Sequence, residues 1–497
     1  MPVYRPIAAC LVMLLLWVAY AYTGVSHGQL GKSGNDIHTP SIAIGISGYV
    51  GAPGLTAYWK HRHELNLRDK PLDDRIKAAA QIPIVWTEPF VGLEDGNNYG
   101  FAIFSMGAFM LLGPSAASLY WGFILLIGAS AAAFCAQYRR DPVAMAAAAT
   151  VLLAMILQLN FTAVGHFIEI DQVYGIRYFP AAGLIAALHV IFALLHPARI
   201  GRAGLALIFL QALLLTLCLM VREASVYFLI VLTIMAGGAL LAYLRRRDDG
   251  RMRGLLAICA AGIVAFGLFQ AVFYARLDAS VSKGVVATNT MWHRMLISLG
   301  ANPAWPIEKV DCDWDFNITG PLRAGIGDAN AYCYWINHVR EGGGSIDDGW
   351  KTVYTDEYGA FIRSQFLRIA EAHPAFMVDT FAYYKPLGAW AAIWQTFRHP
   401  ENAPQRRITA IAIAGFILIV ATMAWPGGRS AWRQWLVPPA VFVLAFAATW
   451  IPEIVAWAAI HTNSDTVLNG LCFAVASCIA LAAALSSVVS SQKPPAA

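Results

Sequence analysis

The chain has 497 residues, of which 58% are hydrophobic and only 13% are charged, and its formal net charge is +5 at pH 7. This balance and a mean hydropathy of +0.55 exclude an ordinary soluble protein and predict an integral membrane protein. The small positive charge comes from arginines in short loops, so it indicates orientation in a lipid bilayer rather than nucleic-acid binding.

Apolar stretches of about twenty residues cross the hydrocarbon core as helices, because a helix satisfies its own backbone hydrogen bonds. The chain contains about ten such stretches, so we expect an all-α polytopic membrane protein. The expected spans are 7–24, 116–136, 142–158, 179–196, 203–220, 225–244, 254–274, 408–426, 436–454 and 466–487.

The first expected span has two interpretations. Arg5 precedes an apolar run, and Ala19-Tyr20-Ala21 resembles the site at which a signal peptide is cleaved. A retained signal-anchor is favoured over a cleaved signal peptide. In both cases the polar stretch that follows, roughly 25–115, is exported.

The end of that polar stretch contains a short apolar segment, residues 99–113. This segment is too short for a span, and a crossing here would place Arg139 and Arg140 outside the cell. We therefore expect a helix that lies in, or dips into, the outer interface of the membrane.

Basic residues in the loops between spans fall on one side of the expected membrane. By the positive-inside rule this side is the cytosol, so the N-terminus is cytosolic and the polar stretches 25–115 and 276–405 face away from it. We expect a multi-pass protein of a bacterial inner membrane with both stretches in the periplasm. The basic loop residues are Arg139, Arg140, Arg199, Arg202, Arg245, Arg246, Arg247, Arg251, Arg253, Arg429 and Arg433.

The layout divides the chain into an N-terminal transmembrane module over 1–274, a second exported loop with interfacial helices over 275–405, and C-terminal transmembrane helices over 406–497. Within the second loop, residues 375–397 are apolar but contain Asp379 and Lys385, which are costly at the centre of a bilayer. An amphipathic or re-entrant helix is expected there, with an eleventh span as the alternative.

Cys312 and Cys333 are the cysteines outside the expected spans. In an oxidising compartment they can form a disulfide that closes a loop of about twenty residues and contributes about 3 kcal/mol. The nearby stretch DCDWD, residues 311–315, has two interpretations. Its carboxylates bind a hard divalent cation, or they are solvated charges, which is favoured because no further ligand spacing accompanies them.

Three stretches resemble a known group of enzymes. They are DGNNYGFAIFSMGAFMLLGPSAASLYWGFILLIGASAAAFCAQYRR at 95–140, MWHRMLISLG at 291–300 and YTDEYGAFIRSQFLRIAEAHPAF at 354–376. The first resembles the GT-C superfamily of glycosyltransferases, as in protein O-mannosyltransferases and aminoarabinose transferases, where a long exported loop leads into an interfacial helix. The other two are similar to the second exported loop of uncharacterised bacterial GT-C-like membrane proteins.

The resemblance implies a GT-C-like fold and transfer of a sugar, with inversion, from a polyprenyl-phosphate donor to a glycan, lipid or protein acceptor on the non-cytosolic side. The donor implies a groove embedded in the bilayer. The reaction implies a carboxylate that takes the proton of the acceptor hydroxyl, and cations that hold the leaving phosphate. Some GT-C enzymes use a divalent metal and others use no cofactor.

The resemblance places the catalytic carboxylate early in the first exported loop. The first acidic residue there is Asp36, in GNDIHTPS, which serves as the general base or is a turn residue of a polar loop. Glu88, in WTEPF, and Asp95 are competing candidates because they precede the interfacial helix. Their alternative interpretation is solvated loop charge.

Arg222, in VREAS, lies between two expected spans on the side where the charge pattern disfavours arginine. A cation in this position needs an anionic partner. The guanidinium binds a lipid phosphate in a bidentate way, or it pairs with a nearby carboxylate. Arg177, in GIRYFP, is a weaker phosphate-binding candidate, and His293 and Arg294 either reach the same site or are solvated loop residues.

Two other functions remain open. A transporter or flippase of lipid-linked or polar substrates would carry polar residues or broken helices at mid-span, whereas these spans are nearly free of charge. An O-antigen polymerase or ligase would carry its large loop late in the chain, whereas this chain has a long loop directly after its first span. No HExxH, GxSxG, Walker-type or CxxC motif is present in the sequence, which disfavours zinc proteases, serine hydrolases, ATP-driven pumps and thiol redox enzymes.

Overall fold

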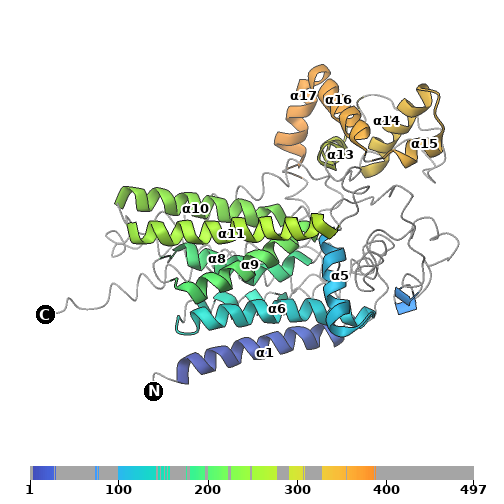
Figure 1. The fold of residues 1–497 in the computed structure, drawn as a ribbon. Helices are drawn as coiled ribbons and strands as arrows, with labels where there is room; N and C mark the ends of the chain where they lie inside the picture. The colour runs from blue at the N-terminus through green and yellow to red at the C-terminus, as the bar shows by residue number, and fades with distance from the viewer. Residues whose placement is uncertain are drawn as a thin grey trace.

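The computed structural model is built from helices, with no strand among the described residues (Figure 1). One hydrophobic core joins the long apolar helices into a bundle, and a second core holds a separate group of shorter helices, which we call the outer unit. The structure describes residues 4–26, 28, 73–74, 76–77, 99–141, most of 144–156, 175, 179–195, 197, 200–221, 225–246, 249–276, 290–305, 307, 327–353, 355–385 and 387.

Four helices in the described part of the chain are long and apolar enough to cross a membrane. They confirm a helical membrane protein with several spans. The expectation of ten spans goes beyond these four, because the expected spans from 408 onward lie outside the described residues and 142–158 is described only in part. The four helices are α1 (Tyr4–Ser26), α6 (Ala116–Tyr138), α9 (Arg202–Val221) and α11 (Asp249–Arg276).

The segment expected to span the membrane at 179–196 departs from the prediction. It begins with the 3-10 helix η3 (Phe179–Gly183), which contains Pro180, and continues as α8 (Leu184–Leu195). The resulting apolar helix is shorter than the four candidate spans, because the chain adopts a regular α-helix only after the proline turn. The next expected span, 225–244, forms the helix α10 (Val226–Arg246), which is not among the four candidate spans.

Two hydrogen bonds in opposite directions join α1 to α6. The Trp17 Nε1–H donates to the carbonyl of Ile124 at 2.9 Å, and the Tyr120 hydroxyl donates to the carbonyl of Ala21 at 2.5 Å. Gly128 makes the close approach possible, because a Cβ atom there would lie 2.9 Å from the Trp17 ring. The first helix is therefore bound to the bundle along two turns of α6, and Ala21 lies inside this contact.

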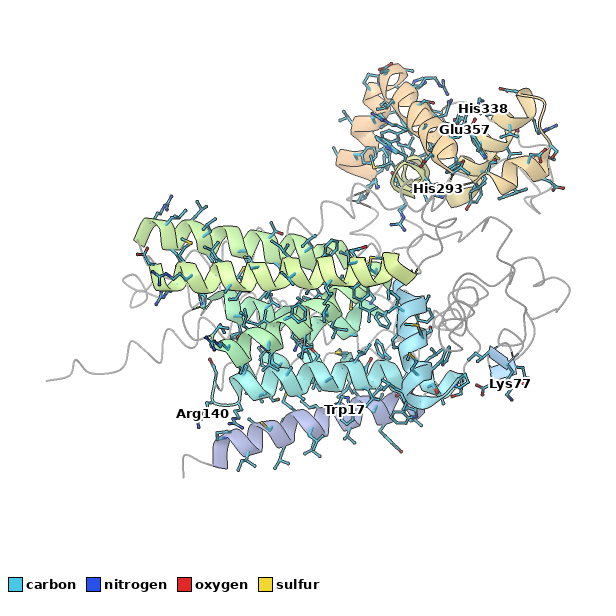
Figure 2. All side chains as sticks on the ribbon, in the orientation of Figure 1. Trp17, Lys77, Arg140, His293, His338 and Glu357 are labelled. Carbon is cyan, nitrogen blue, oxygen red and sulfur yellow. The ribbon has the colours of Figure 1, made fainter. Side chains whose placement is uncertain are left out.

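Helix ends that carry arginine gather at one end of the bundle. Gly204 at the start of α9 lies against Gln137 near the end of α6, and Gly254 near the start of α11 lies against Pro197. Figure 2 shows Arg140 at this end, beside the N-terminal part of α1. The described arginines here are Arg139, Arg140, Arg202, Arg245, Arg251 and Arg253, as the charge pattern predicted. We call this the basic end of the bundle.

The outer unit has its own aromatic core, centred on the buried residues Trp335, Tyr358 and Phe366. Its longest helix begins at Asp356, and the side chain of the preceding Thr355 accepts a hydrogen bond from the amide of Tyr358. The elements are α13 (Thr290–Ile297), η6 (Ser298–Ala301), α14 (Gly327–Glu341), α15 (Ile346–Lys351), α16 (Asp356–Ala372), α17 (Pro374–Val378) and the π-helix η7 (Asp379–Tyr384).

The described part of the segment 375–397 belongs to the outer unit. Phe376 packs in its core, and Asn302 donates a hydrogen bond of 3.0 Å to the hydroxyl of the buried Thr380. Lys385 follows η7 and is also buried, with its Nζ 5.0 Å from the centre of the Phe381 ring. Burial lowers the pKa of Lys385 to about 7. Whether 375–397 also enters the membrane stays a prediction, since the segment beyond Leu387 lies outside the described residues.

Candidate functional site at the end of the bundle opposite the basic end

The helix α5 (Tyr99–Leu112) lies across the end of the bundle that is opposite the basic end (Figure 1). It is apolar but shorter than the candidate spans, as expected for residues 99–113. The chain leaves it at Gly113, whose φ of +83° lies in the left-handed region that glycine adopts without strain. Ser115 then caps α6, so α5 and α6 form a tight corner at this end of the bundle.

Aromatic rings fix α5 to the start of η3. Phe179 meets Phe104 of α5 edge to face, with ring centroids 4.7 Å apart, and also contacts Phe101 and Phe123. Contacts of this geometry contribute about 0.5–1.5 kcal/mol each beyond the burial of their area. Phe179 therefore lies against α5, and Arg177 precedes it by two residues in the sequence.

The first turn of α5 lies on the last turn of α9. A Cβ atom on Gly100 would overlap the backbone of Met220 and Val221, so this contact requires glycine. Arg222 follows Val221 directly in the sequence, and one trans peptide separates neighbouring Cα atoms by about 3.8 Å. Arg222 and Arg177 themselves lie outside the described residues, but both adjoin segments that α5 covers.

An apolar cavity of about 360 Å³ lies between α8, α9, α10 and α11. Its lining extends from Leu219 and Ser225, near the end covered by α5, to Ile208 and Leu194 nearer the basic end. Thr216, Thr233 and Cys259 are the other residues with a polar side-chain atom in this lining. The volume and apolar lining of this cavity are typical of sites that bind a hydrophobic ligand.

The Ser225 hydroxyl is the polar group of the lining that lies closest in sequence to Arg222. It is buried and has no hydrogen-bond partner within the described part of the chain. A buried hydroxyl without a partner is unfavourable by about 1–3 kcal/mol. A ligand oxygen at this end of the cavity would remove that cost.

A chain of polar side chains crosses the bundle between α6, α8 and α9. Gln137 Oε1 lies 3.0 Å from His189 Nε2, and Gln211 Nε2 lies 3.2 Å from His189 Nδ1. The Ser130 hydroxyl donates to Gln211 Oε1 at 2.8 Å, and Gln137 donates to the hydroxyl of Tyr138. We assign the imidazole proton to Nε2, because Gln211 donates to Nδ1. These side chains thus satisfy one another's hydrogen-bonding groups, and the hydrogen bonds join three helices.

The remaining predicted residues are distributed between the outer unit and undescribed segments. His293 is only 4% exposed, and its Nδ1 lies 2.5 Å from the Tyr358 hydroxyl, so the structure places it in the core of the outer unit. Arg294 is half-buried on α13 beside it. The candidate bases Asp36, Glu88 and Asp95 lie outside the described residues.

Cys333 is buried and disulfide-bonded. Its partner lies outside the described residues, and the four described cysteines at 10, 135, 218 and 259 are free. The pairing with Cys312 therefore stays a prediction. No cluster of three or more His, Cys, Asp or Glu side chains is arranged for a metal ion within the part of the chain that the structure describes, and DCDWD lies outside that part.

Sequence reasoning missed the cavity and the polar chain. Single polar residues in otherwise apolar helices, such as His189 in LIAALHVIFALL and Gln211 in the next helix, were the available signal for the chain. The cavity left no such signal, because it depends on which apolar helices become neighbours. No family model, curated protein or solved structure matches this chain.

Proposed function

We propose that this protein is a membrane glycosyltransferase of GT-C-like architecture, with about ten spans in a bacterial inner membrane. It moves a sugar from a polyprenyl-phosphate donor to a glycan, lipid or protein acceptor on the non-cytosolic side. The observation that carries the proposal is the apolar cavity, which ends at Ser225, three residues after Arg222 in the sequence. An apolar cavity that ends three residues from an arginine in the sequence suits a lipid with an anionic head.

In this proposal the isoprenoid chain of the donor occupies the cavity and its phosphate lies beneath α5. Arg222 and Arg177 neutralise the phosphate, and the Ser225 hydroxyl donates to one of its oxygens. Cations at the leaving group favour the transition state, because negative charge grows on the phosphate as the bond to the sugar breaks. Both arginines are expected to act on the same phosphate, since each lies close in sequence to a residue that contacts the first half of α5, Phe179 and Val221.

The proposed reaction is a single displacement with inversion. The acceptor hydroxyl oxygen attacks the anomeric carbon while a carboxylate takes its proton, and the bond between that carbon and the phosphate oxygen breaks with its electron pair on oxygen. The products are the glycosylated acceptor and polyprenyl phosphate. Asp36 is the first candidate for the carboxylate, with Glu88 and Asp95 as the alternatives.

The apolar surface of α5 supports placement of this site at a membrane interface. Met110 and Leu111 at its C-terminal end are largely exposed. Such residues are unfavourable in water but suit the acyl boundary of the outer leaflet. The candidate phosphate site would then lie at the level of lipid headgroups, where a membrane-bound donor and an acceptor in the periplasm meet.

Transfer of labelled sugar from a panel of polyprenyl-phosphate sugars tests the proposal. Membranes with matched amounts of wild type, Asp36→Asn and Arg222→Ala are compared. Loss of turnover in Asp36→Asn identifies the base, and a raised apparent KM for the donor in Arg222→Ala identifies the phosphate ligand. If Asp36→Asn keeps its activity, Glu88→Gln and Asp95→Asn are the next variants. Absence of transfer by the wild type with every donor overturns the proposal.

A transporter or flippase is the second candidate function, and the buried chain around His189 is the observation that favours it. A protonatable group inside a bundle is common in proton-coupled transport. The polar side chains around His189 hydrogen-bond to each other, however, and so leave few free donors or acceptors for a substrate. Flux of a lipid-linked sugar into vesicles without its cleavage would establish this function. An O-antigen polymerase or ligase would instead join the saccharide to a second glycan in the same transfer assay.

A further inference from the structure

A short helical turn of the first polar stretch is attached to the bundle. Asp73 Oδ1 accepts a hydrogen bond of 2.7 Å from the amide of Ala116, the first residue of α6. Ile76, one turn further along, is only 1% exposed and belongs to the hydrophobic core of the bundle. One hydrogen bond and one apolar side chain therefore hold this turn on the same surface.

The charged side chains of the turn are in contact with solvent. The side chains of Asp74 and Lys77 are 55% and 73% exposed, and their ends lie 3.9 Å apart. Figure 2 shows Lys77 beside the corner between α5 and α6. Asp73 is exposed as well, so Ile76 is the described residue of the turn that is buried in the bundle, and Asp73 reaches the bundle with its carboxylate.

The place of attachment is the corner between α5 and α6. The first amides of a helix have no partner inside the helix. Ser115 accepts from the amide of Ser118, and Asp73 accepts from the amide of Ala116, so two different segments share the capping of α6. A negative charge at this position is also favoured by the helix dipole.

We propose that Asp73 is a positioning residue that, together with Ile76, fixes the first polar stretch on the corner of α5 and α6. In the sequence the attached turn lies between the candidate bases Asp36 and Glu88. The attachment stands on the observed contacts, and its effect on catalysis rests on the proposed glycosyltransferase function. If one of these carboxylates is the base, the attachment at Asp73 limits how far the stretch that contains it moves from α5 and α6.

Hydrogen exchange of the full chain in lipid nanodiscs, followed by mass spectrometry, tests the attachment without any activity assay. Asp73→Ala is expected to speed exchange about fivefold in peptides around residues 73–77 and at the start of α6, as loss of one hydrogen bond predicts. Exchange in peptides of α9 and α11 should stay unchanged. Asp74→Ala removes a neighbouring carboxylate that does not touch the bundle, and it should behave like wild type.

Asp73→Asn keeps an oxygen that accepts from Ala116, so it should restore most of the protection. If Asp73→Ala exchanges like wild type, or if Asp74→Ala has the same effect, the attachment is wrong.

In the transfer assay, Asp73→Ala should lower kcat and leave the donor KM unchanged, because the phosphate site is intact. If exchange becomes faster in Asp73→Ala as expected but the wild type transfers no sugar, the glycosyltransferase proposal is overturned and the attachment is established.

Discussion

Gly100 of α5 lies against the backbone of Val221 at the end of α9, and a Cβ atom at position 100 would overlap the Val221 nitrogen. The contact has no flexible side chain that moves aside, so it determines how closely α5 approaches the segment that leads to Arg222. The position of α5 relative to the residue that precedes Arg222, the expected phosphate ligand, therefore depends on this single glycine.

Gly100→Ala is expected to displace α5 and to destabilise the protein by about 1–3 kcal/mol, as overpacking does in a tight contact. Thermal unfolding in detergent measures the loss. Gly107→Ala is the matched control, because position 107 on the same helix has open space around its Cβ and alanine improves helix propensity by up to about 1 kcal/mol. Equal stability of the two variants would contradict the contact.

Gly262→Leu is expected to fill part of the cavity. Gly262 lines it, and nothing lies within 4 Å of a Cβ atom there, so the new side chain enters without a backbone clash. If the cavity holds the lipid chain of the donor, the donor KM should rise about tenfold, which corresponds to about 1.4 kcal/mol of binding. Gly267→Leu, on the exposed side of the same helix, should leave the KM unchanged.

Gln211→Leu is expected to destabilise the bundle by about 1–2 kcal/mol, because the Ser130 hydroxyl and His189 Nδ1 both lose a partner inside an apolar environment. A second change, His189→Leu, removes one of the polar groups left without a partner. The double variant should therefore lose less unfolding free energy than the sum of the losses of the two single variants. A double-mutant cycle of unfolding free energies measures this coupling. Additive losses would show that the two residues do not interact.

Stability of the outer unit is expected to depend on the titration of Lys385. Above the ordinary lysine pKa of 10.5, the amine is neutral in both states and burial adds no protonation cost. As the pH falls toward 7, the unfolded chain takes up the proton and the folded protein does not, so stability decreases by about 1.4 kcal/mol per pH unit. Below the folded pKa of about 7 the decrease ends.

Thermal unfolding between pH 7 and pH 10, read from the near-ultraviolet signal of the buried tryptophans of the outer unit, checks this dependence. Lys385→Met should flatten the profile over that window. Lys77→Met alters a lysine that is exposed to solvent, and its profile should match wild type. A wild-type profile that is already flat would show that Lys385 is protonated in the folded protein.

Peptide mapping of the non-reduced protein should find Cys333 joined to Cys312. The eight cysteines of the chain include four described as free, and of the three others that remain for Cys333 only Cys312 lies in the same polar stretch. Replacing both residues by alanine should destabilise the outer unit by about 3 kcal/mol. A peptide that joins Cys333 to Cys472 or Cys478 would instead connect the outer unit to the last expected span.

The sequence predicted features that depend on local length and charge. The apolar segment before Gly113 was too short for a span and forms α5, and the arginines in short loops lie together at the basic end. Both results follow from bilayer thickness and the cost of charge, which a single segment reveals. The proline turn at Pro180, by contrast, shortens a stretch that hydropathy alone reads as one span.

The contacts of the candidate site could not be predicted, because they join residues distant in the sequence. Asp73 and Ala116 belong to a polar stretch and a later helix, and nothing in the sequence around Asp73 distinguishes it from a solvated carboxylate. The sequence left His293 either at the phosphate site or as a solvated loop residue, yet it is buried among aromatic rings of α14 and α16. Tertiary packing decides such positions.

The two hydrogen bonds between α1 and α6 determine an order of events during synthesis. They join residues that are 107 and 99 positions apart, so α1 enters the membrane long before its partner exists. At about 5–20 residues per second, roughly 5–20 s pass between the synthesis of α1 and that of its partner residues in α6. During that interval the indole N–H of Trp17 has no carbonyl of α6 to donate to. Another acceptor, in the translocation machinery or the surrounding lipid, must take its place.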